Sequence, residues 1–581
     1  MIRTRRAGGA SRTWVFPPAE PGLAELVAHA AGVSRTTGHV LVNRGIRDAS
    51  TAKRFLQPRL DDLPDPLRLS GMRVAADRLH RALREDERIA LFGDYDVDGT
   101  AGTAILAKFI RLVGRDPLIR VPHRMSDGYG LNAGAVGEFA AAGAKVLVTI
   151  DCGTNNHQEV ELARSLGMDV IIVDHHETPT KESAAMALIN PKADAGYPFK
   201  GVCSAGIAFK LADTLARGMG RLPGDAHARF ILDALAYAVL GTVADVVPLV
   251  DENRILVSFG LTALEKCPSP GLRALVDKAG LTGKPVTSTD IAFKLAPRLN
   301  ALGRLGSAQS IVDLLLSEDP DRIGDLIRQL ESANRERKEI EDQICEEAVR
   351  MIETTPSLAR DPVIVLASDA WHVGVVGIVA ARLVDKYAKP AFVLAIDGDL
   401  AKGSGRSVEG FGLHDALEAV RDVLVSGGGH ARAAGAGVRR ERIEEFRARI
   451  NEHAEKAMAG RKAEPTLEVD DEVSLDEVTP ALARELARLE PHGEGNRAPR
   501  LVASHVAVAG RPKLMGKQQN HLSFHVAGPE GPGLRAVAFS RGDWYDSVAA
   551  ARTVSLAFRP MINEWMGRQS VELHVEDIKF V

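Results

Sequence analysis

The stretch "IALFGDYDVDGTAGTAIL", residues 89–106, places an apolar run directly before three aspartates at alternate positions, Asp94, Asp96 and Asp98. Like charges repel one another at a strand end, so either a cation lies among them or the segment is a solvated acidic loop. The pattern D-x-D-x-D-G matches the opening of a calcium EF-hand loop, which requires a Glu at its twelfth position. Position twelve is Ile105, which excludes the EF-hand interpretation.

Two further apolar runs end in the same kind of residue. "AKVLVTI" (144–150) is followed by Asp151, and "MDVIIV" (168–173) is followed by "DHH" (174–176). Near-continuous apolar strands are typical of a parallel sheet that helices cover on both faces. Because sites in such sheets form beyond the carboxyl ends of the strands, we expect these carboxylates and imidazoles to converge.

Asp245 is a fourth candidate, because it lies in the apolar run "LGTVADVVPL" (240–249), where an unpaired charge is costly to bury. Carboxylates with one or two imidazoles suit Mg²⁺ or Mn²⁺. This number of ligands predicts two ions with a bridging carboxylate and water. Each motif alone has a plainer interpretation as a solvated loop or a surface histidine pair, but the four together predict a metal centre.

Composition sets the class of protein. The chain has 581 residues, 45% of them hydrophobic and 26% charged, as in soluble globular proteins of about three to four domains. We find no window of about 20 apolar residues and no secretory signal, and the four cysteines form no C-x-x-C pair. We therefore expect a cytoplasmic protein without membrane segments, disulfides or zinc. The net charge of −4 does not exclude local basic patches that bind nucleic acid.

The order of the patterns predicts an α/β protein with a long linker helix and a C-terminal β-barrel. Residues 331–339, "ESANRERKE", carry no large apolar side chain, which suggests a helix that bridges two domains through solvent. Five short β-like runs after residue 500 favour an OB-fold. The expected divisions are an N-terminal segment packed on the catalytic domain (1–75), the catalytic domain (76–319), the linker helix (320–355), a second α/β domain (356–460) and the barrel (461–581).

Two glycine-rich segments are candidates for phosphate binding. "GSGRS" (403–407) places Ser404 and Arg406 in a turn, where backbone N–H groups and a guanidinium can hold phosphate. "SGGGHARAAG" (426–435) lets a ligand approach the backbone closely and adds His430. The plainer interpretation of either segment is a flexible turn.

The tail combines basic and aromatic residues. From Asn496 onward it has 11 Lys and Arg against 7 Asp and Glu. Its aromatic residues include Phe524, Phe539, Trp544, Tyr545, Phe558 and Trp565. Aromatic side chains among basic ones suit single-strand binding by stacking and phosphate contact, although most of the phenylalanines are expected in the barrel core.

Four motifs, "GDYDVDGT" (93–100), "DCGT" (151–154), "DHHE" (174–177) and "GTVADVVPL" (241–249), resemble in order those of the DHH phosphoesterase superfamily. Longer blocks resemble the bacterial RecJ family of single-stranded-DNA-specific exonucleases. They are "IAFKLAPRLNALGRLGSA" (291–308), "WHVGVVGIVAARL" (371–383) and "GGGHARAAG" (427–435).

The resemblance implies a role for each matching residue. The implied metal ligands are Asp96, Asp98, Asp151, His175 and Asp245, with Asp151 as the bridge and the catalytic centre completed by Asp94 and His176. Asp94 would be a ligand or an orienting carboxylate, and His176 would hold its neighbour or contact the scissile phosphate. The implied contacts to the DNA 5′ end are Arg124, Arg304, Ser404 and Arg406, with His430 beside them. A structural ion pair is the alternative for Arg298 and Arg304.

The family further implies a DHH-type domain, a DHHA1-type second domain and an OB-fold. It implies a monomeric exonuclease that uses two Mn²⁺ or Mg²⁺ ions to degrade single-stranded DNA from 5′ to 3′ into 5′-mononucleotides. Work in repair and recombination is implied, with single-strand binding protein and a RecQ-type helicase as partners. One alternative is a phosphodiesterase for short oligonucleotides or cyclic dinucleotides, and another is an inactive single-strand-binding scaffold. The barrel argues against the first, and the complete ligand set argues against the second.

Overall fold

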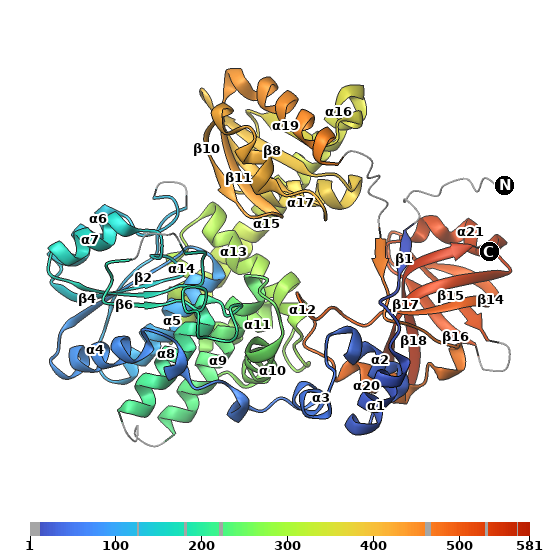
Figure 1. Ribbon diagram of the computed structural model, residues 1–581, viewed down its shortest axis with the longest axis horizontal. Helices are drawn as coiled ribbons and strands as arrows, with labels where there is room; N and C mark the ends of the chain where they lie inside the picture. The colour runs from blue at the N-terminus through green and yellow to red at the C-terminus, as the bar shows by residue number, and fades with distance from the viewer. Residues whose placement is uncertain are drawn as a thin grey trace.

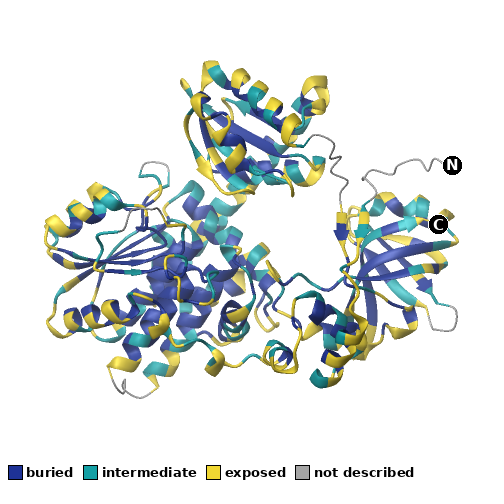
Figure 2. Ribbon diagram, in the orientation of Figure 1, coloured by how far each residue is buried: buried dark blue, intermediate teal, exposed yellow. Residues whose placement is uncertain are grey.

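The computed structural model describes residues 12–124, 127–178, 183–219, 225–458, 466–528, 533–565 and 567–580. It shows an α/β domain before the long helix α15 (Pro320–Thr354), a smaller α/β domain after it, and a β-barrel near the C-terminus (Figure 1). Buried positions gather inside each of these bodies, and exposed positions cover their outer surfaces (Figure 2).

The first domain is built on a parallel sheet with the order β3-β2-β4-β5-β6. Its strands are β2 (Arg88–Gly93), β3 (Leu118–Arg120), β4 (Ala144–Ile150), β5 (Asp169–Val173) and β6 (Ala187–Ile189). The three apolar runs of the sequence analysis are therefore the three central strands. They are apolar throughout because alternate side chains face opposite sides of the sheet and both sides are covered.

Helices cover the two faces of this sheet. Leu91 and Val148 face α4 (Met72–Arg84), α5 (Val97–Leu112) and α8 (Ser204–Gly218). Phe92 and Leu147 face α6 (Ala133–Ala141) and α7 (His157–Ser165). The doubly covered parallel sheet confirms the predicted α/β class.

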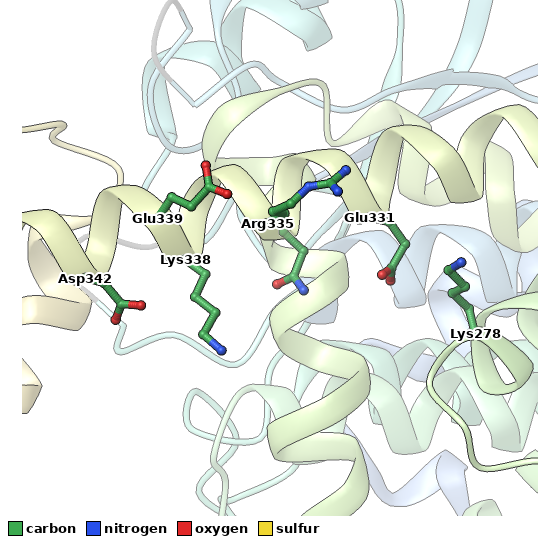
Figure 3. A pocket seen from close by; sticks show the side chains of 7 residues that line it. Lys278, Glu331, Arg335, Lys338, Glu339 and Asp342 are labelled. Carbon is green, nitrogen blue, oxygen red and sulfur yellow. The ribbon is translucent and has the colours of Figure 1, made fainter. Parts of the chain in front are cut away.

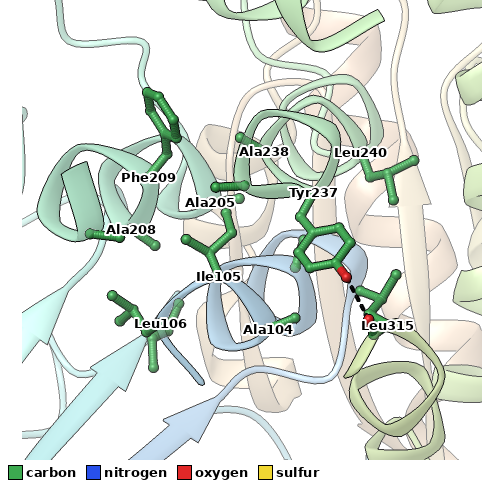
Figure 4. Close-up of a cluster of buried hydrophobic side chains, with 14 of the residues drawn as sticks. Ala104, Ile105, Leu106, Ala205, Ala208, Phe209, Tyr237, Ala238, Leu240 and Leu315 are labelled. Carbon is green, nitrogen blue, oxygen red and sulfur yellow. Dashed lines mark hydrogen bonds between the residues drawn. The ribbon is translucent and has the colours of Figure 1, made fainter. Parts of the chain in front are cut away.

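A helical layer extends this domain. Its elements are α9 (Ala226–Ala244), α10 (Asp251–Lys266), α11 (Pro270–Lys278), α12 (Ser288–Asp290), the π-helical turn η3 (Ile291–Leu295), α13 (Ala296–Leu305) and α14 (Gln309–Leu316). In Figure 4, Tyr237 of α9 lies among α5, α8 and α14, and its hydroxyl donates a hydrogen bond to the carbonyl of Leu315.

Helix α9 differs from one expectation. Among the described residues it is the one helix long and apolar enough, by length and composition, to cross a membrane, whereas the sequence analysis found no such window. About two thirds of that window, 67%, is buried inside the protein. Its packing against α5, α8 and α10 accounts for its apolar composition.

Helix α15 joins the two α/β domains and is buried near both ends. Leu326 and Leu330 belong to the core of the first domain, and Ile344 and Ala348 pack with α17 (Val376–Tyr387) of the second. Just past its polar middle, Glu341 is only 3% exposed and is paired with arginines on α15 and α17. The helix is thus anchored in both cores, and only its middle matches the expected solvent bridge.

The second domain has a mixed sheet with the order β10-β11-β9-β8-β7, in which only β7 and β8 are parallel. Its strands are β7 (Ile364–Ser368), β8 (Ala391–Asp397), β9 (Leu400–Arg406), β10 (Leu424–Gly429) and β11 (Ala433–Arg439). Helix α17 covers one face, and α18 (Leu413–Glu418) and α19 (Ile443–Ala457) cover the other.

The C-terminal strands close into the expected barrel. Their order is β14-β15-β16-β18-β17, and β17 pairs back with β14. The strands are β14 (Leu501–Met515), β15 (His521–Ala527), β16 (Leu534–Ala538), β17 (Thr553–Trp565) and β18 (Arg568–Phe580). Phe524 and Phe558 are buried, as expected of barrel core, and Trp544 is buried too, which does not suit the stacking suggested for it, whereas Phe539 is 52% exposed. The side chain of Trp565 lies outside the described part of the structure.

The helices before residue 57 pack on this barrel, which differs from the expected packing on the catalytic domain, whereas Leu69, Met72 and Ala75 lie in the core of the catalytic domain as expected. Strand β1 (Thr13–Val15) pairs with β12 (Thr466–Glu468), and α1 (Pro21–Ala31), α2 (Arg35–Asn43) and α3 (Ala49–Leu56) follow it. Val27 and Leu41 share one apolar core with Leu482 and Phe524. The segment from β1 to α3 (13–56) and the described residues from β12 to β18 (466–580) therefore form a single body, which we call the barrel module.

Candidate active site

The acidic motifs begin at the same edge of the parallel sheet. The backbone N–H of Asp94 donates to the carbonyl of Ile150 at 3.0 Å, and that of Asp151 donates to Val173 at 2.9 Å. The N–H of Asp174 donates to Ile189 at 3.1 Å. Each bond extends the ladder by one residue beyond a strand end, so the three motifs start side by side.

Glycines make room for the first motif. Asp96 caps α5 by accepting the N–H groups of Asp98 at 2.8 Å and Gly99 at 3.1 Å. A Cβ on Gly99 would lie 2.6 Å from the backbone nitrogen of Asp94. A Cβ on Gly241 of α9 would lie 2.6 Å from a carboxylate oxygen of Asp98. Any larger residue at either position would displace a candidate ligand.

The candidate ligands gather into groups whose oxygen and nitrogen atoms lie within 4.8 Å of one another. The groups are Asp94 with Asp96 and Asp151, Asp98 with His175 and Asp245, and Asp151 with His175 and His176. His175 Nε2 lies 3.4 Å from Asp151 Oδ1, 3.4 Å from Asp245 Oδ2 and 3.9 Å from Asp98 Oδ2. Asp151 thus belongs to the first and third groups, and His175 belongs to the second and third.

Helix α8 supports this cluster through residues that the sequence analysis did not single out. The backbone N–H groups of Ser204 and Ala205 donate to the two oxygens of Asp98 at 2.7 and 2.9 Å. The hydroxyl of Ser204 donates to Asp151 at 3.0 Å. The helix N-terminus therefore partly compensates the negative charge of Asp98.

The buried charge at this site calls for cations. Burial, followed by the repulsion of neighbouring carboxylates, raises the pKa of Asp94, Asp96, Asp151 and Asp245. Asp94 Oδ1 is buried and has no hydrogen-bond partner among the described residues. An orphaned carboxylate oxygen within a cluster of oxygen and imidazole donors fits a hard or borderline divalent ion.

Asp174 contacts both histidines that follow it and fixes their positions. Its Oδ1 accepts the N–H of His175 at 2.8 Å and lies 2.7 Å from Nδ1 of His176, and its Oδ2 accepts the N–H of Thr154. Burial lowers the pKa of His176, but the bond to Asp174 and the charges of Asp174, Asp96 and Asp98 together outweigh burial, so the net shift is upward. The hydroxyl of Tyr129, another residue absent from the sequence predictions, lies 3.1 Å from His176 Nδ1.

A cavity of about 290 Å³ opens in front of this cluster. Its lining includes the carboxylates Asp94, Asp96 and Asp151 and the guanidinium groups of Arg124 and Arg304. The guanidinium of Arg124 lies 4.9 Å from the centre of the Tyr95 ring. Arg304 Nη1 donates to the carbonyl of Gly374 at 2.7 Å, which places the second α/β domain at the mouth of the cavity.

The second domain adds two predicted residues, Ser404 and Arg406, to the group formed by Arg124 and Arg304, which we call the arginine cluster. A Cβ on Gly377, near the start of α17, would lie 3.1 Å from Ser404 Oγ and 3.4 Å from Arg406 Nη2. Burial and then the charge of Arg124 lower the pKa of Arg406. Burial and the charges of Arg124, Arg337 and Arg406 lower the pKa of Arg304 to about 10. Guanidinium groups crowded in this way are typical of a site for an anion.

The remaining predicted residues differ in the groups that they contact. Arg298 pairs with Glu331 at 2.8 Å, which makes it the structural ion pair, whereas Arg304 has no carboxylate partner within the described ranges. His430 lies in the exposed turn between β10 and β11, and Arg406 is the register partner of Ala433 at the end of that turn. The turn therefore borders the arginine cluster.

A larger hollow of about 560 Å³ lies along α15, with Lys278 of α11 at one end (Figure 3). It is lined by Lys278, Glu331, Asn334, Arg335, Lys338, Glu339 and Asp342. Charges of both signs lie there, and Glu331 and Asp342 are already paired with arginines. This surface lacks the one-sided charge that a phosphate chain requires.

Known proteins share this arrangement. Family models match the DHH family N-terminal domain over residues 88–239, the DHHA1 domain over 360–456 and the RecJ OB domain over 469–577. The single-stranded-DNA-specific exonuclease RecJ of Escherichia coli (strain K12) is 35% identical over 562 residues, which cover 92% of this chain and 94% of that protein.

Solved structures agree along almost the whole length. The crystal structure of RecJ from Thermus thermophilus in complex with Mn²⁺ matches with a TM-score of 0.83 and 30% identity, over 98% of this chain and 79% of that one. The Mg²⁺ complex of the same protein matches with a TM-score of 0.77 and 29% identity, over 98% and 78%. The chain therefore belongs to the RecJ family within the DHH phosphoesterases.

Proposed function

We propose that the chain is a Mn²⁺- or Mg²⁺-dependent exonuclease that degrades single-stranded DNA from its 5′ end into 5′-mononucleotides. One observation carries the proposal: a single cavity is lined both by buried carboxylates and by Arg124 and Arg304, and the charge of Arg406 from the second domain acts on Arg304. Such a cavity combines ligands for cations with groups that hold phosphate.

Two ions would be held by the groups that the structure gathers. Asp98, His175 and Asp245 form one set of donors, and Asp94, Asp96 and Asp151 form the other. Asp151 is the proposed bridge, because its Oδ1 lies 3.4 Å from His175 of the first set. Bound ions supply an activated water and polarise the phosphate. Asp174 orients both histidines, and His176, which Asp174 holds through Nδ1, would contact the scissile phosphate.

The arginine cluster would determine polarity. Arg124, Arg304 and Arg406 crowd together without carboxylate partners among the described residues, so a bound phosphate would relieve their repulsion. Ser404 and the start of α17 add a hydroxyl and a helix N-terminus, which favours an anion. His430 borders the same cluster. A 5′-terminal phosphate held there leaves the first internucleotide bond at the carboxylates.

The cellular role follows from the substrate. Single strands arise when duplex DNA is unwound, so a RecQ-type helicase and single-strand binding protein are the proposed partners, in repair and recombination in the cytoplasm. Both groups of candidate ligands and the lining of the cavity come from one chain, which supports a monomer as the working unit.

Strands labelled at either end test the proposal. With Mn²⁺ or Mg²⁺, a 5′-labelled strand should release labelled mononucleotide at once, and a 3′-labelled strand should shorten progressively. A block at the 5′ end should stop digestion, and a block at the 3′ end should not. Digestion from the 3′ end would overturn the polarity. Cleavage of dinucleotides without cleavage of long strands would favour the short-substrate alternative, and tight binding without cleavage would favour the scaffold.

A further inference from the structure

One buried asparagine joins two backbone segments that lie beside the candidate ligands. Asn253, in the first turn of α10, is 0% exposed. Its Nδ2 donates to the carbonyl of Gly201 at 2.7 Å and to the carbonyl of Pro248 at 2.9 Å. Gly201 shortly precedes Ser204, the first residue of α8, and Pro248 shortly follows Asp245. Both N–H groups of a single amide therefore hold together two segments that are far apart in the sequence.

Each of these segments places one carboxylate of the same group. The backbone N–H groups of Ser204 and Ala205 donate to the two oxygens of Asp98, so the position of this helix end determines where that carboxylate lies. Within the described residues, the carboxylate of Asp245 accepts no hydrogen bond, and Nε2 of His175 lies 3.4 Å from it. The position of Asp245 therefore depends on the backbone that carries it.

That backbone requires support from its surroundings. Val246 has φ 59° and Asp251 has φ 46°, a left-handed conformation that residues with a Cβ rarely adopt. The bond from Asn253 to Pro248 falls between these two positions. Unfavourable backbone conformations persist only where neighbouring groups hold them in place, so this bond helps to keep Asp245 at the metal centre.

The first turn of α10 is itself anchored on both sides of Asn253. Glu252 pairs with Nζ of Lys210 on α8 at 2.5 Å and accepts the hydroxyl of Tyr197 at 3.0 Å. Glu252 and Lys210 are each only 2% exposed. Arg254 donates to backbone carbonyls of the barrel module. A fully buried polar network of this kind is rigid, which makes Asn253 a fixed point for the two segments.

We propose that Asn253 is a positioning residue for the ion that Asp98, His175 and Asp245 would hold. Its amide keeps the segment after Asp245 against the segment before α8, and so keeps the two carboxylates together. The proposal rests on the proposed function and deepens it, because it assigns one buried residue to one of the two ion sites. The other group of ligands contains neither Asp98 nor Asp245 and should depend less on this contact.

Titration of the metal-free protein with Mn²⁺ tests this role. By calorimetry, Asn253→Ala should weaken one Mn²⁺ site about tenfold and leave the other within about threefold of wild type, as expected for a residue that orients metal ligands. Asn451→Ala is the matched control. Asn451 is also buried and also joins two backbone segments, through Val363 and Arg447, but it lies in the second α/β domain. Its variant should lose stability and keep both Mn²⁺ affinities.

The dependence of cleavage on Mn²⁺ separates positioning from a general loss of structure. The Mn²⁺ concentration for half-maximal cleavage should rise about tenfold in Asn253→Ala. At saturating Mn²⁺, kcat and the KM for a single strand should both stay within about twofold of wild type, because the ion restores the arrangement of its ligands. Asn253→Ser can still donate to one of the two carbonyls. It should show a smaller shift at the same site, and it carries the test if the alanine variant does not fold.

Several results would overturn the positioning role and leave the exonuclease in place. They are equal weakening of both Mn²⁺ sites, unchanged affinity at both, and a kcat that stays low at saturating Mn²⁺. A wild-type protein that cleaves no single strand with Mn²⁺ would instead refute the proposed function, and this role with it.

Discussion

Replacing Asp151 by Asn should separate metal binding from folding. The side chain keeps its size and can still accept the Ser204 hydroxyl, which donates at 3.0 Å. It loses the charge that belongs both to the group with Asp94 and Asp96 and to the group with His175. We therefore expect weaker binding at both proposed ion sites and a fall in the hydrolysis rate of about 10³-fold, which corresponds to about 4 kcal/mol of lost transition-state stabilisation.

Without metal, Asp151→Asn should not lower the stability of the protein and can raise it. At the 4.8 Å limit of the group, two ionised carboxylates repel by about 3.5 kcal/mol at an effective dielectric constant of about 20. Proton uptake relieves part of this repulsion, as the raised pKa of Asp151 indicates. The neutral amide introduced by Asp151→Asn removes the remainder, so without metal this variant should unfold at the same temperature as wild type or higher.

Thermal unfolding with and without Mn²⁺ measures both effects. An ion present at 100 times its Kd stabilises the wild type by about 2.7 kcal/mol for each site, and Asp151→Asn should lose most of that gain. Asp116→Asn is the matched control, since its carboxylate is 77% exposed in the same domain. Equal stabilisation of variant and wild type by Mn²⁺, or activity within tenfold of wild type, would refute Asp151 as the shared ligand.

Three further predictions concern the rest of the molecule. Arg406→Ala should slow digestion of 5′-phosphorylated strands more than that of strands without the phosphate, whereas Arg406→Lys should keep part of that preference; equal loss on both substrates would contradict a 5′-end contact. Burial and then the charges of Arg44, Arg254 and Arg559 lower the pKa of His492 to about 3, so the free energy of unfolding should fall as the pH drops from about 6.5 toward 3. Denaturant titration should measure a loss of about 2 kcal/mol between pH 7 and 5. A His492→Gln variant that shows the same loss would contradict this assignment. Deleting residues 466–581 alone should yield an aggregating protein, because α1–α3 lose the core that they share with the barrel. A fragment of residues 58–458 should instead stay soluble, cleave short oligonucleotides and bind long strands weakly. A soluble, monodisperse fragment of residues 1–465 would show that the helices need no barrel.

Sequence reasoning succeeded where the signal was local. The strands β2, β4 and β5 are apolar on both faces, and a charge follows each of them, so their ends and the convergence of Asp94, Asp151 and His175 could be read from short windows. The five barrel strands were visible for the same reason, as apolar runs between turn residues. In each case the physical determinant lies within about ten residues of the chain.

Sequence reasoning failed where function depends on the orientation of polar groups. Asp174 has the same residue type and position as its neighbours at the sheet edge, yet its oxygens are taken by N–H groups of the DHH segment and by Thr154. Ser204 matters because the helix N-terminus that it begins points at Asp98. Tyr129 reaches His176 from a loop between glycines of positive φ. No periodicity or composition indicates any of these contacts.

The packing of the N-terminal helices was also invisible to local reasoning, and it changes how the domains must work together. Arg254 of α10 is 3% exposed and donates to the backbone carbonyls of Phe55, Arg488 and Leu489, at 2.9, 3.2 and 2.8 Å. One catalytic-domain side chain thus binds both ends of the chain where they meet in the barrel module. Three such bonds to a buried charge fix the module against α10, whose first residues lie close to Asp245 in the chain. The position of the barrel module relative to the first α/β domain therefore depends on this contact.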